Sequence, residues 1–250
     1  MSRCLHGMLV IAFLGLPAIL RAEDSPKDIL AKAIKAHGGE EFLTKNPASK
    51  TKNKGKLTLP GVGEIEFTQE VAYMLPNKFR ESMEFTINGM AVKVVTLVNG
   101  DKISIEANGT DVPITDQIKA ALKSAEHLMK VSRMVPALKE KGYELSAAGE
   151  IKVGDNSAAG VRVSVKGQKD IMMYFDKKTG LLARLDHQAI DAMSGNEVSE
   201  ERVVLQYEKN AAGIPITKKV VVKRDGKAFL EAEVLEFKQF EKLDDSEFEK

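Results

Sequence analysis

The stretch at residues 63–89, GEIEFTQEVAYMLPNKFRESMEFTING, alternates between apolar and polar residues with a period of two. The apolar positions are Ile65, Phe67, Val71 and Tyr73 in the first half and Phe79, Met83, Phe85 and Ile87 in the second. This period is typical of strands with one buried face. Pro76-Asn77 between the halves and Asn88-Gly89 after them are turn residues. The stretch therefore predicts antiparallel strands joined by hairpins.

The same pattern continues outward from this stretch. Met90, Val92 and Val94 lead to a turn at Asn99-Gly100, and Ile103 and Ile105 lead to another at Asn108-Gly109. Later strand-like runs lie at residues 161–165, 171–175, 181–185, 203–207, 216–222 and 230–237. The chain thus predicts about eleven strands, connected mainly by short turns.

The segment YFDKKTGLL at residues 174–182 contains a Lys-Thr-Gly that could be mistaken for part of a phosphate loop. A phosphate loop needs several glycines before its lysine and a helix after it, whereas here the only glycine follows the lysines. We interpret the segment as a hairpin turn that Asp176 opens and in which Gly180 has a positive φ.

Two helices are expected beside these strands. The first is capped by Ser25, has Pro26 at its first position and ends at Gly38-Gly39. The second begins at Thr115, repeats apolar residues at helical spacing as far as Val135, and ends at Pro136 or Gly142. The predicted fold class is α+β: one strongly curved, unclosed antiparallel sheet with an N-terminal helix and a long helix over its concave face. Because no linker divides the chain, residues 23–250 are expected to form one domain.

Residues 1–22 have the layout of a secretory signal, with Arg3, an apolar run and Ala22 at the cut. We expect cleavage near Ala22 and a periplasmic or secreted protein without stable membrane insertion. An uncleaved anchor is the alternative, although the run is short for a membrane span. Cys4, the only cysteine, would leave with the signal, so the mature chain would have no disulfide and no lipid anchor.

No motif supplies the chemistry of an enzyme. His37, His127 and His187 are far apart in the sequence and are expected to be surface or cap residues rather than metal ligands. A serine nucleophile motif is absent from the sequence. The near balance of 37 basic and 36 acidic residues gives no reason to expect nucleic acid. We therefore expect no catalytic residue, no metal site and no cofactor.

Two charged clusters are interpreted without a ligand. Lys50, Lys52, Lys54 and Lys56 alternate along an extended segment, which is typical of an edge strand that lysines protect from aggregation. The acidic residues at 244–249 are expected to form a solvated C-terminal tail.

Five segments resemble the periplasmic lipoprotein carriers of the LolA/LolB-like superfamily and related exported proteins. They are MLPNKFR (74–80), TLVNGDKISIEANG (96–109), FDKKTGLLARLD (175–186), AAGIPITKKVVVKRDGK (211–227) and KLDDSEF (242–248). The resemblance implies an unclosed β-barrel with helices as a lid and a cavity that holds acyl chains. Leu75 stands where the carriers commonly have a basic residue that helps to control cargo retention and release, which puts a lipoprotein-shuttle role in question.

The resemblance and the alternation together suggest residues that line a ligand cleft. They are Phe67, Val71, Tyr73, Met83, Phe85, Val92 and Met129. The alternative for each is a filled core, because small barrels are usually filled by side chains. The expected partner is an acyl chain, lipid or lipoprotein, with an envelope protein as a further partner. The other function class is an envelope protein-interaction module whose barrel is a filled scaffold.

Overall fold

The computed structural model describes residues 24–250 of the chain, so the expected signal segment at 1–22 and the cut at Ala22 lie outside the described residues. The helices are α1 (Pro26–Ala36), α2 (Glu40–Lys45), α3 (Asp116–Ser132), α4 (Val135–Lys139) and a 3₁₀ turn, η1 (Asp245–Phe248). The strands are β1 (Ala48–Leu59), β2 (Gly63–Met74), β3 (Lys78–Ile87), β4 (Met90–Asn99), β5 (Lys102–Ala107), β6 (Thr110–Asp111), β7 (Tyr143–Val153), β8 (Asn156–Val165), β9 (Ile171–Asp176), β10 (Leu182–Ile190), β11 (Glu197–Lys209), β12 (Pro215–Arg224) and β13 (Lys227–Phe240).

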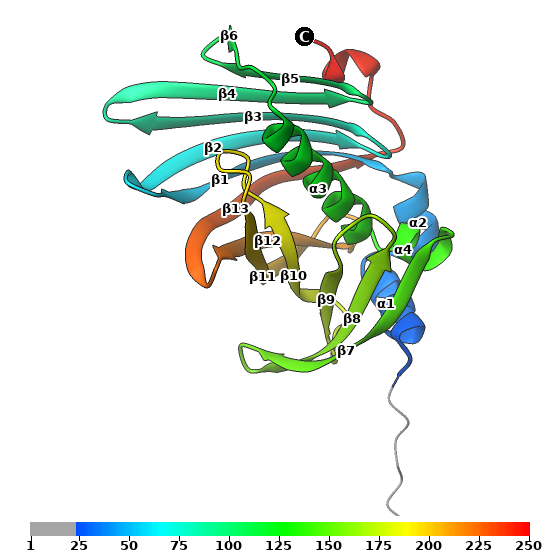
Figure 1. Cartoon of the computed structure of the whole chain (residues 1–250). Helices are drawn as coiled ribbons and strands as arrows, with labels where there is room; N and C mark the ends of the chain where they lie inside the picture. Colours follow the sequence, from blue (N-terminus) through cyan, green and yellow to red (C-terminus); the bar gives the residue numbers. More distant parts are fainter. Residues whose placement is uncertain (1–23) are drawn as a thin grey trace, which may run out of the picture.

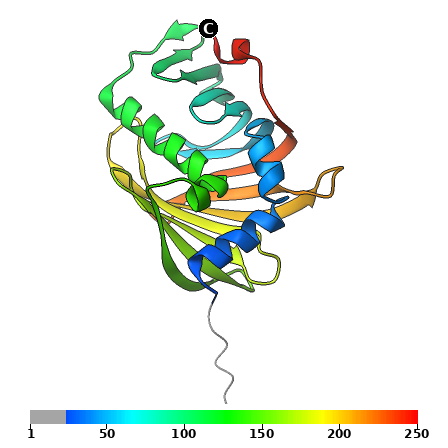
Figure 2. The ribbon, with the colours of Figure 1, turned by 90° about the vertical axis from the view of Figure 1, so that its right-hand side faces the viewer.

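All thirteen strands form one antiparallel sheet in the order β6-β5-β4-β3-β2-β1-β13-β12-β11-β10-β9-β8-β7. The sheet curves strongly without closing, and α3 runs across its open side (Figures 1 and 2). The edge strands β6 and β7 follow each other in the chain, and α3 and α4 form the connection between them. This arrangement confirms the predicted fold class, with two more strands than the sequence indicated.

Strand β1 lies in the middle of the sheet, so its interpretation as an edge strand was wrong. It pairs with β2 on one side and with β13 on the other. Its lysines face carboxylates of these neighbours: Lys52 Nζ lies 2.9 Å from Glu70 and Lys56 Nζ lies 2.8 Å from Glu64. The sequence pattern could not reveal this placement because a row of alternating lysines also suits a solvated face with cross-strand ion pairs.

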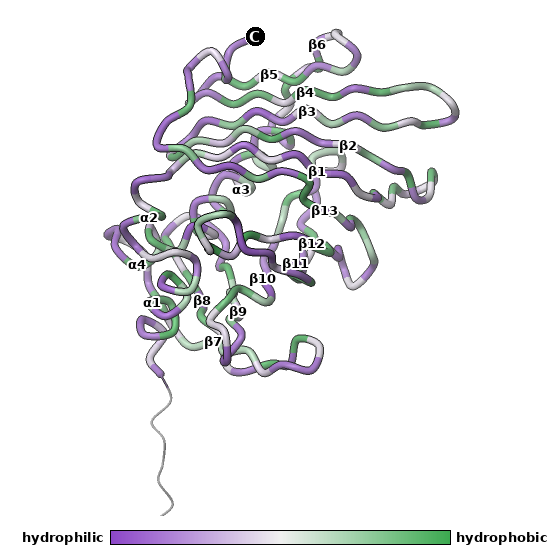
Figure 3. Tube along the Cα trace, turned by 180° about the vertical axis from the view of Figure 1, so that it is seen from behind, coloured by the Kyte–Doolittle hydropathy of each residue, from purple (hydrophilic) through white to green (hydrophobic). Residues whose placement is uncertain are grey.

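The alternation along the strands places apolar side chains on the concave face, and Figure 3 shows hydrophilic and hydrophobic residues alternating along the tube. Phe67 and Tyr73 of β2 are 3% and 5% exposed.

Strand β7 was missed because its apolar alternation, with Tyr143 and Leu145 at one end and Ile151 and Val153 at the other, is interrupted by small residues at a β-bulge between Ala147 and Gly149.

The N-terminal helix is as predicted, since the Ser25 side chain caps α1 and Pro26 is at its start. The second helix ends earlier than predicted, at Ser132 rather than at Pro136 or Gly142. Met134 has a positive φ of 63°, and the Val135 amide donates to the Arg133 carbonyl at 2.7 Å across it. This γ-turn separates α3 from α4, so Pro136 lies in the first turn of the next helix.

The hairpin at residues 174–182 is a turn, as predicted. Asp176 Oδ1 accepts hydrogen bonds from the amides of Lys178 (3.0 Å) and Thr179 (2.8 Å), and Gly180 has a φ of +74°. The next connection, from β10 to β11, repeats the pattern with Asp191, because Asp191 Oδ1 accepts from the amides of Met193 (3.2 Å) and Ser194 (2.8 Å). An Asp-x-x-Thr/Ser-Gly turn thus holds two successive hairpins.

The core lies mainly where α1, α3 and α4 cover strands β8 to β10. Leu30, Val131, Val163 and Met173 are completely buried there. A second cluster holds the C-terminal turn: Phe248 of η1 is 1% exposed and belongs to a cluster with Ala48 and Met74. The acidic C-terminal segment is therefore not a solvated tail, although most of its carboxylates remain exposed.

Candidate functional site

A cavity of about 1090 Å³ lies between α3 and the concave face of the sheet. Strands β1 to β3 from the start of the chain and β11 to β13 from its end contribute most of the sheet side of its wall, because β1 and β13 are neighbours in the sheet. Its apolar lining includes Leu57, Val71, Met83, Val98, Leu122, Leu128, Met129, Val220, Val222, Phe229, Leu230, Val234 and Phe237. The space is wide enough for a ligand of lipid or drug size.

Four of the residues suggested from the sequence line this cavity: Val71, Tyr73, Met83 and Met129. The other three, Phe67, Phe85 and Val92, border a separate hollow of about 940 Å³ that β1 to β4, β12 and β13 line together with charged side chains. Phe67 and Phe85 also belong to a packed apolar cluster with Leu57 and Ile65.

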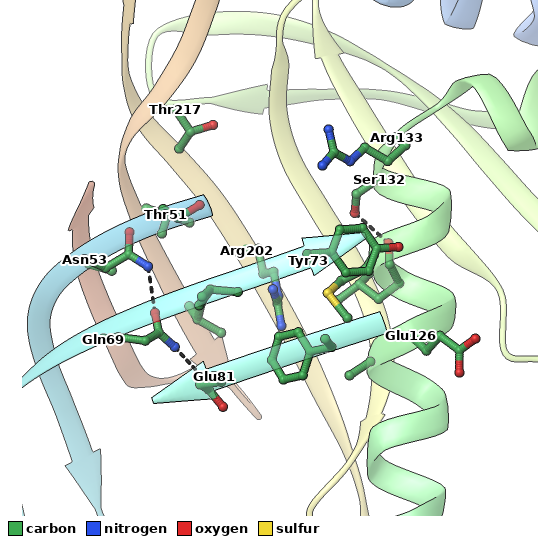
Figure 4. Close-up of a pocket in the computed structure, with 18 of the residues that line it drawn as sticks. Thr51, Asn53, Gln69, Tyr73, Glu81, Glu126, Ser132, Arg133, Arg202 and Thr217 are labelled. Atoms are coloured by element: carbon green, nitrogen blue, oxygen red, sulfur yellow. Dashed lines mark hydrogen bonds between the residues drawn. The ribbon is translucent and has the colours of Figure 1, made fainter. Parts of the chain in front are cut away.

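The concave wall also carries a polar chain that the sequence reasoning missed. Asn53 Nδ2 donates to Gln69 Oε1 at 2.7 Å, and Gln69 Nε2 donates in turn to Glu81 (Figure 4). Burial raises the pKa of the Glu81 carboxyl, and the hydrogen bond from Gln69 offsets this only in part. A signal was present, because Gln69 and Glu81 occupy inward positions of strands that otherwise alternate regularly.

A second polar group lies where the end of α3 meets β1 and β2. Arg133 Nη2 donates to Ser49 Oγ at 3.2 Å. The Arg133 guanidinium carbon lies 5.7 Å from the centre of the Tyr73 ring, and Figure 4 shows both of these side chains. No carboxylate of residues 24–250 forms an ion pair with Arg133. Burial lowers the pKa of Arg133 and raises the pKa of Tyr73. The Tyr73 hydroxyl is buried and has no hydrogen-bond partner among the described residues.

The third group is a buried carboxylate, Glu200 of β11, with three cationic or polar neighbours. Glu200 is 1% exposed, and its oxygens accept from Arg202 Nε at 2.7 Å, from Arg224 Nε at 2.9 Å and from His187 Nε2 at 3.2 Å. Burial by itself would raise the pKa of Glu200, but His187 and Arg202 together hold it well below its usual range. Both arginines line the cavity, and their two charges are balanced by Glu200 together with Asp191, which lies 3.4 Å from Arg224 Nη1.

His37 is the C-cap residue of α1, as expected of a cap histidine, whereas His187 differs from its sequence interpretation. His187 is buried rather than exposed, and it lines a small cavity of about 310 Å³ together with His127, so these two are not far apart. His37 is half-buried at the end of α1, where its Nδ1 lies 2.8 Å from the Ala33 carbonyl oxygen. Within residues 24–250, no three His, Cys, Asp or Glu side chains come together as metal ligands could.

No known family profile matches the sequence, and no curated protein matches it. Solved structures do match. A DUF1329 family protein from Desulfovibrio piger aligns with a TM-score of 0.58 at 14% identity, over 91% of this chain and 98% of that chain. A putative outer membrane lipoprotein-sorting protein domain from Vibrio parahaemolyticus aligns with a TM-score of 0.53 at 7% identity, over 89% and 95% of the two chains.

A LolA superfamily protein from Nitrosomonas europaea aligns with a TM-score of 0.50 at 9% identity, over 91% of this chain and 99% of that chain. Within residues 24–250, none of the helices is both long enough and apolar enough to span a bilayer. At these identities the likeness concerns the fold, and the described part of the chain has the curved, unclosed sheet of the LolA-like structures.

Proposed function

We propose that this protein is an exported, non-enzymatic carrier or binder of a lipid or a lipidated protein, and that the acyl chain lies in the cavity beneath α3. The observation that supports this most is the unfilled interior of about 1090 Å³, because an interaction module with a filled barrel would have no such space. The shared fold with a putative lipoprotein-sorting domain agrees with the proposal.

A carrier of this kind needs apolar wall rather than reactive groups. Burial of an acyl chain is worth about 0.8 kcal/mol per methylene, so ten buried methylenes would supply about 8 kcal/mol before the cost of binding. Val71, Met83 and Met129 are proposed to contact the chain, and the flexible methionines would adapt to its shape. Phe67, Phe85 and Val92 border the other hollow, so they would contact an acyl chain only if it extended beyond the apolar cluster around Leu57.

Helix α3 is the proposed lid. Its only buried side chains, Leu128 and Val131, lie near its C-terminal end, whereas the part that begins at Asp116 has none. The helix is therefore anchored at one end, and opening at the other end would cost little buried apolar surface. This half-anchored helix suits a lid that shifts to admit a chain.

Binding of a fluorescent long-chain acyl probe tests the proposal with two neighbouring substitutions. Val71→Trp places a large ring in the cavity, while Glu70→Trp places the same ring on an exposed position of the same strand. We expect the wild type and Glu70→Trp to bind the probe, and Val71→Trp to keep its fold but lose binding. If the delipidated wild type binds no acyl probe, the carrier proposal fails and the interaction-module alternative takes its place.

Hydrogen exchange tests the lid independently. Amides near Asp116 should exchange faster than those near Val131 in the free protein and should gain protection when the probe binds. Equal protection along the whole of α3, unchanged by lipid, would mean that the helix is a fixed plug.

A further inference from the structure

The proposed function does not specify the polar head group of the acyl ligand. The cavity wall contains a cation, Arg133, that indicates which head groups it can bind. We propose that the cavity selects acyl ligands with a single free carboxylate, which Arg133 and Tyr73 bind at the end of α3. This inference rests on the proposed function, because the same cavity holds the chain.

The charges around the cavity identify Arg133 as the site of the anion. Arg202 and Arg224 also line the cavity, but both donate to Glu200, and Arg224 Nη1 lies 3.4 Å from a second carboxylate, Asp191. Lys123, which lies at the cavity, is exposed to water. Arg133 is partly buried, lines the cavity and forms no ion pair within residues 24–250. It is therefore the cation that is available to a ligand anion.

An unpaired guanidinium in a partly buried place costs free energy, as its lowered pKa indicates. An anion that forms an ion pair with it would recover part of this cost, and a carboxylate can accept two parallel hydrogen bonds from a guanidinium. The empty form of the protein thus keeps a cation ready for a ligand anion.

A neighbouring hydroxyl supplies a further donor. The Tyr73 side chain lines the cavity, and its hydroxyl has no partner among the described residues, so its proton is free to donate to a ligand. Ser132, also in the wall, is not available because its hydroxyl donates to the Leu128 carbonyl at 2.7 Å. One cation and one free hydroxyl match a monoanion with two oxygens, whereas a phosphate monoester would leave a second charge unbalanced.

Arg133 also has a structural explanation, which any test must separate from ligand binding. It follows the last residue of α3, where a cation interacts favourably with the helix dipole, and it links α3 to β1 through Ser49. Stability alone therefore cannot decide between the two roles. Tyr73→Phe can, since loss of an unpaired buried hydroxyl should leave the free protein equally stable or more stable and still weaken anion binding.

The experiment compares hexadecanoic acid, hexadecan-1-ol and hexadecyl phosphate as competitors of the acyl probe at about pH 8, where the acid is ionised. The wild type should bind the acid about 10- to 100-fold more tightly than the alcohol and more tightly than the phosphate. Arg133→Met should bind the alcohol normally and lose the preference for the acid. Tyr73→Phe should lose about 3- to 10-fold in binding of the acid alone. Arg202→Met, whose charge Glu200 neutralises, should keep the preference.

The outcomes separate the two proposals. If neither the acid nor the alcohol binds the wild type, the proposed function fails. If both bind equally, or if Tyr73→Phe and Arg133→Met retain the preference, the carrier remains and the carboxylate site is refuted. Tighter binding of the phosphate than of the acid refutes it as well. If Arg133→Met does not fold, the result with Tyr73→Phe decides.

Discussion

Replacement of Glu200 by glutamine should destabilise the protein far more than the same change at the next residue. Glu200 is 1% exposed and accepts from two arginines and a histidine. Glutamine has the same shape but no charge, and its amide must turn an N–H toward one of these donors. Breaking a buried ion pair costs about 3–5 kcal/mol, and since the arginine side chains are 44% and 27% exposed, we expect about 3 kcal/mol.

The matched control is Glu201→Gln. Glu201 also has two cationic neighbours, Arg184 Nη1 at 2.8 Å and Lys223 Nζ at 3.3 Å, but its side chain is 24% exposed. Its loss should cost about 0–1 kcal/mol. For a domain of this size, a loss of about 3 kcal/mol lowers the melting temperature by about 6–12 °C. Urea unfolding and thermal melting at neutral pH check both variants, and equal effects at the two positions would refute the reasoning.

Acid unfolding gives a second test of the Glu200 network. The pKa of Glu200 in the folded protein lies below its ordinary value of 4.5, so its contribution to stability is complete above about pH 4.5 and declines as the pH falls below that value. The wild type should therefore lose stability more steeply than Glu200→Gln as the pH falls from about 4.5 toward 2. If the two curves are parallel, the folded protein does not lower the pKa of Glu200 below its value in the unfolded chain, and the reasoning is wrong.

Three further substitutions have defined outcomes. Glu81→Gln should raise the melting temperature at neutral pH and have no benefit below about pH 4.5, because the raised pKa of this buried acid penalises its charged form; a drop at pH 7 contradicts this. Gly55→Ala should cost about 2 kcal/mol in urea unfolding, since its Cβ would lie 1.9 Å from the Glu231 carbonyl oxygen, whereas exposed Thr58→Ala on the same strand should cost little. Asp176→Ala should cost about 2 kcal/mol because the turn amides lose their acceptor, and an unchanged urea midpoint would show that the turn forms without it.

The sequence predicted the fold well because strand alternation and turn residues are local. The pairing of Phe67 with Phe85 follows from the turn between β2 and β3, and the first helix follows from Ser25 and Pro26. The position of β1 was not predictable in this way, since its partner β13 lies almost at the other end of the chain. The local pattern also does not show which carboxylates lie next to the lysines of β1.

The cavity was predictable only in part. Inward-facing Val71, Tyr73 and Met83 were found from the alternation, but the same alternation also selected Phe67 and Phe85, which border a different hollow. The polar lining was missed because the partners of Arg133 and of Glu200 lie on elements that are distant in the sequence. A local pattern cannot show which residues the fold brings together. A charged residue at an inward strand position, such as Glu81, was the available sign of a polar interior.

The pairing of β1 with β13 also sets an order of events in folding. Ala48 lies opposite Phe240 and Leu57 opposite Leu230, so the central ladder of the sheet joins residues from the two ends of the chain. Contacts of such long sequence separation form late and slowly. Until β13 arrives, β1 has one unpaired side, and during this interval its alternating lysines would discourage pairing with a second copy of the chain. A strand that is central in the finished protein is thus protected in the way that an edge strand requires.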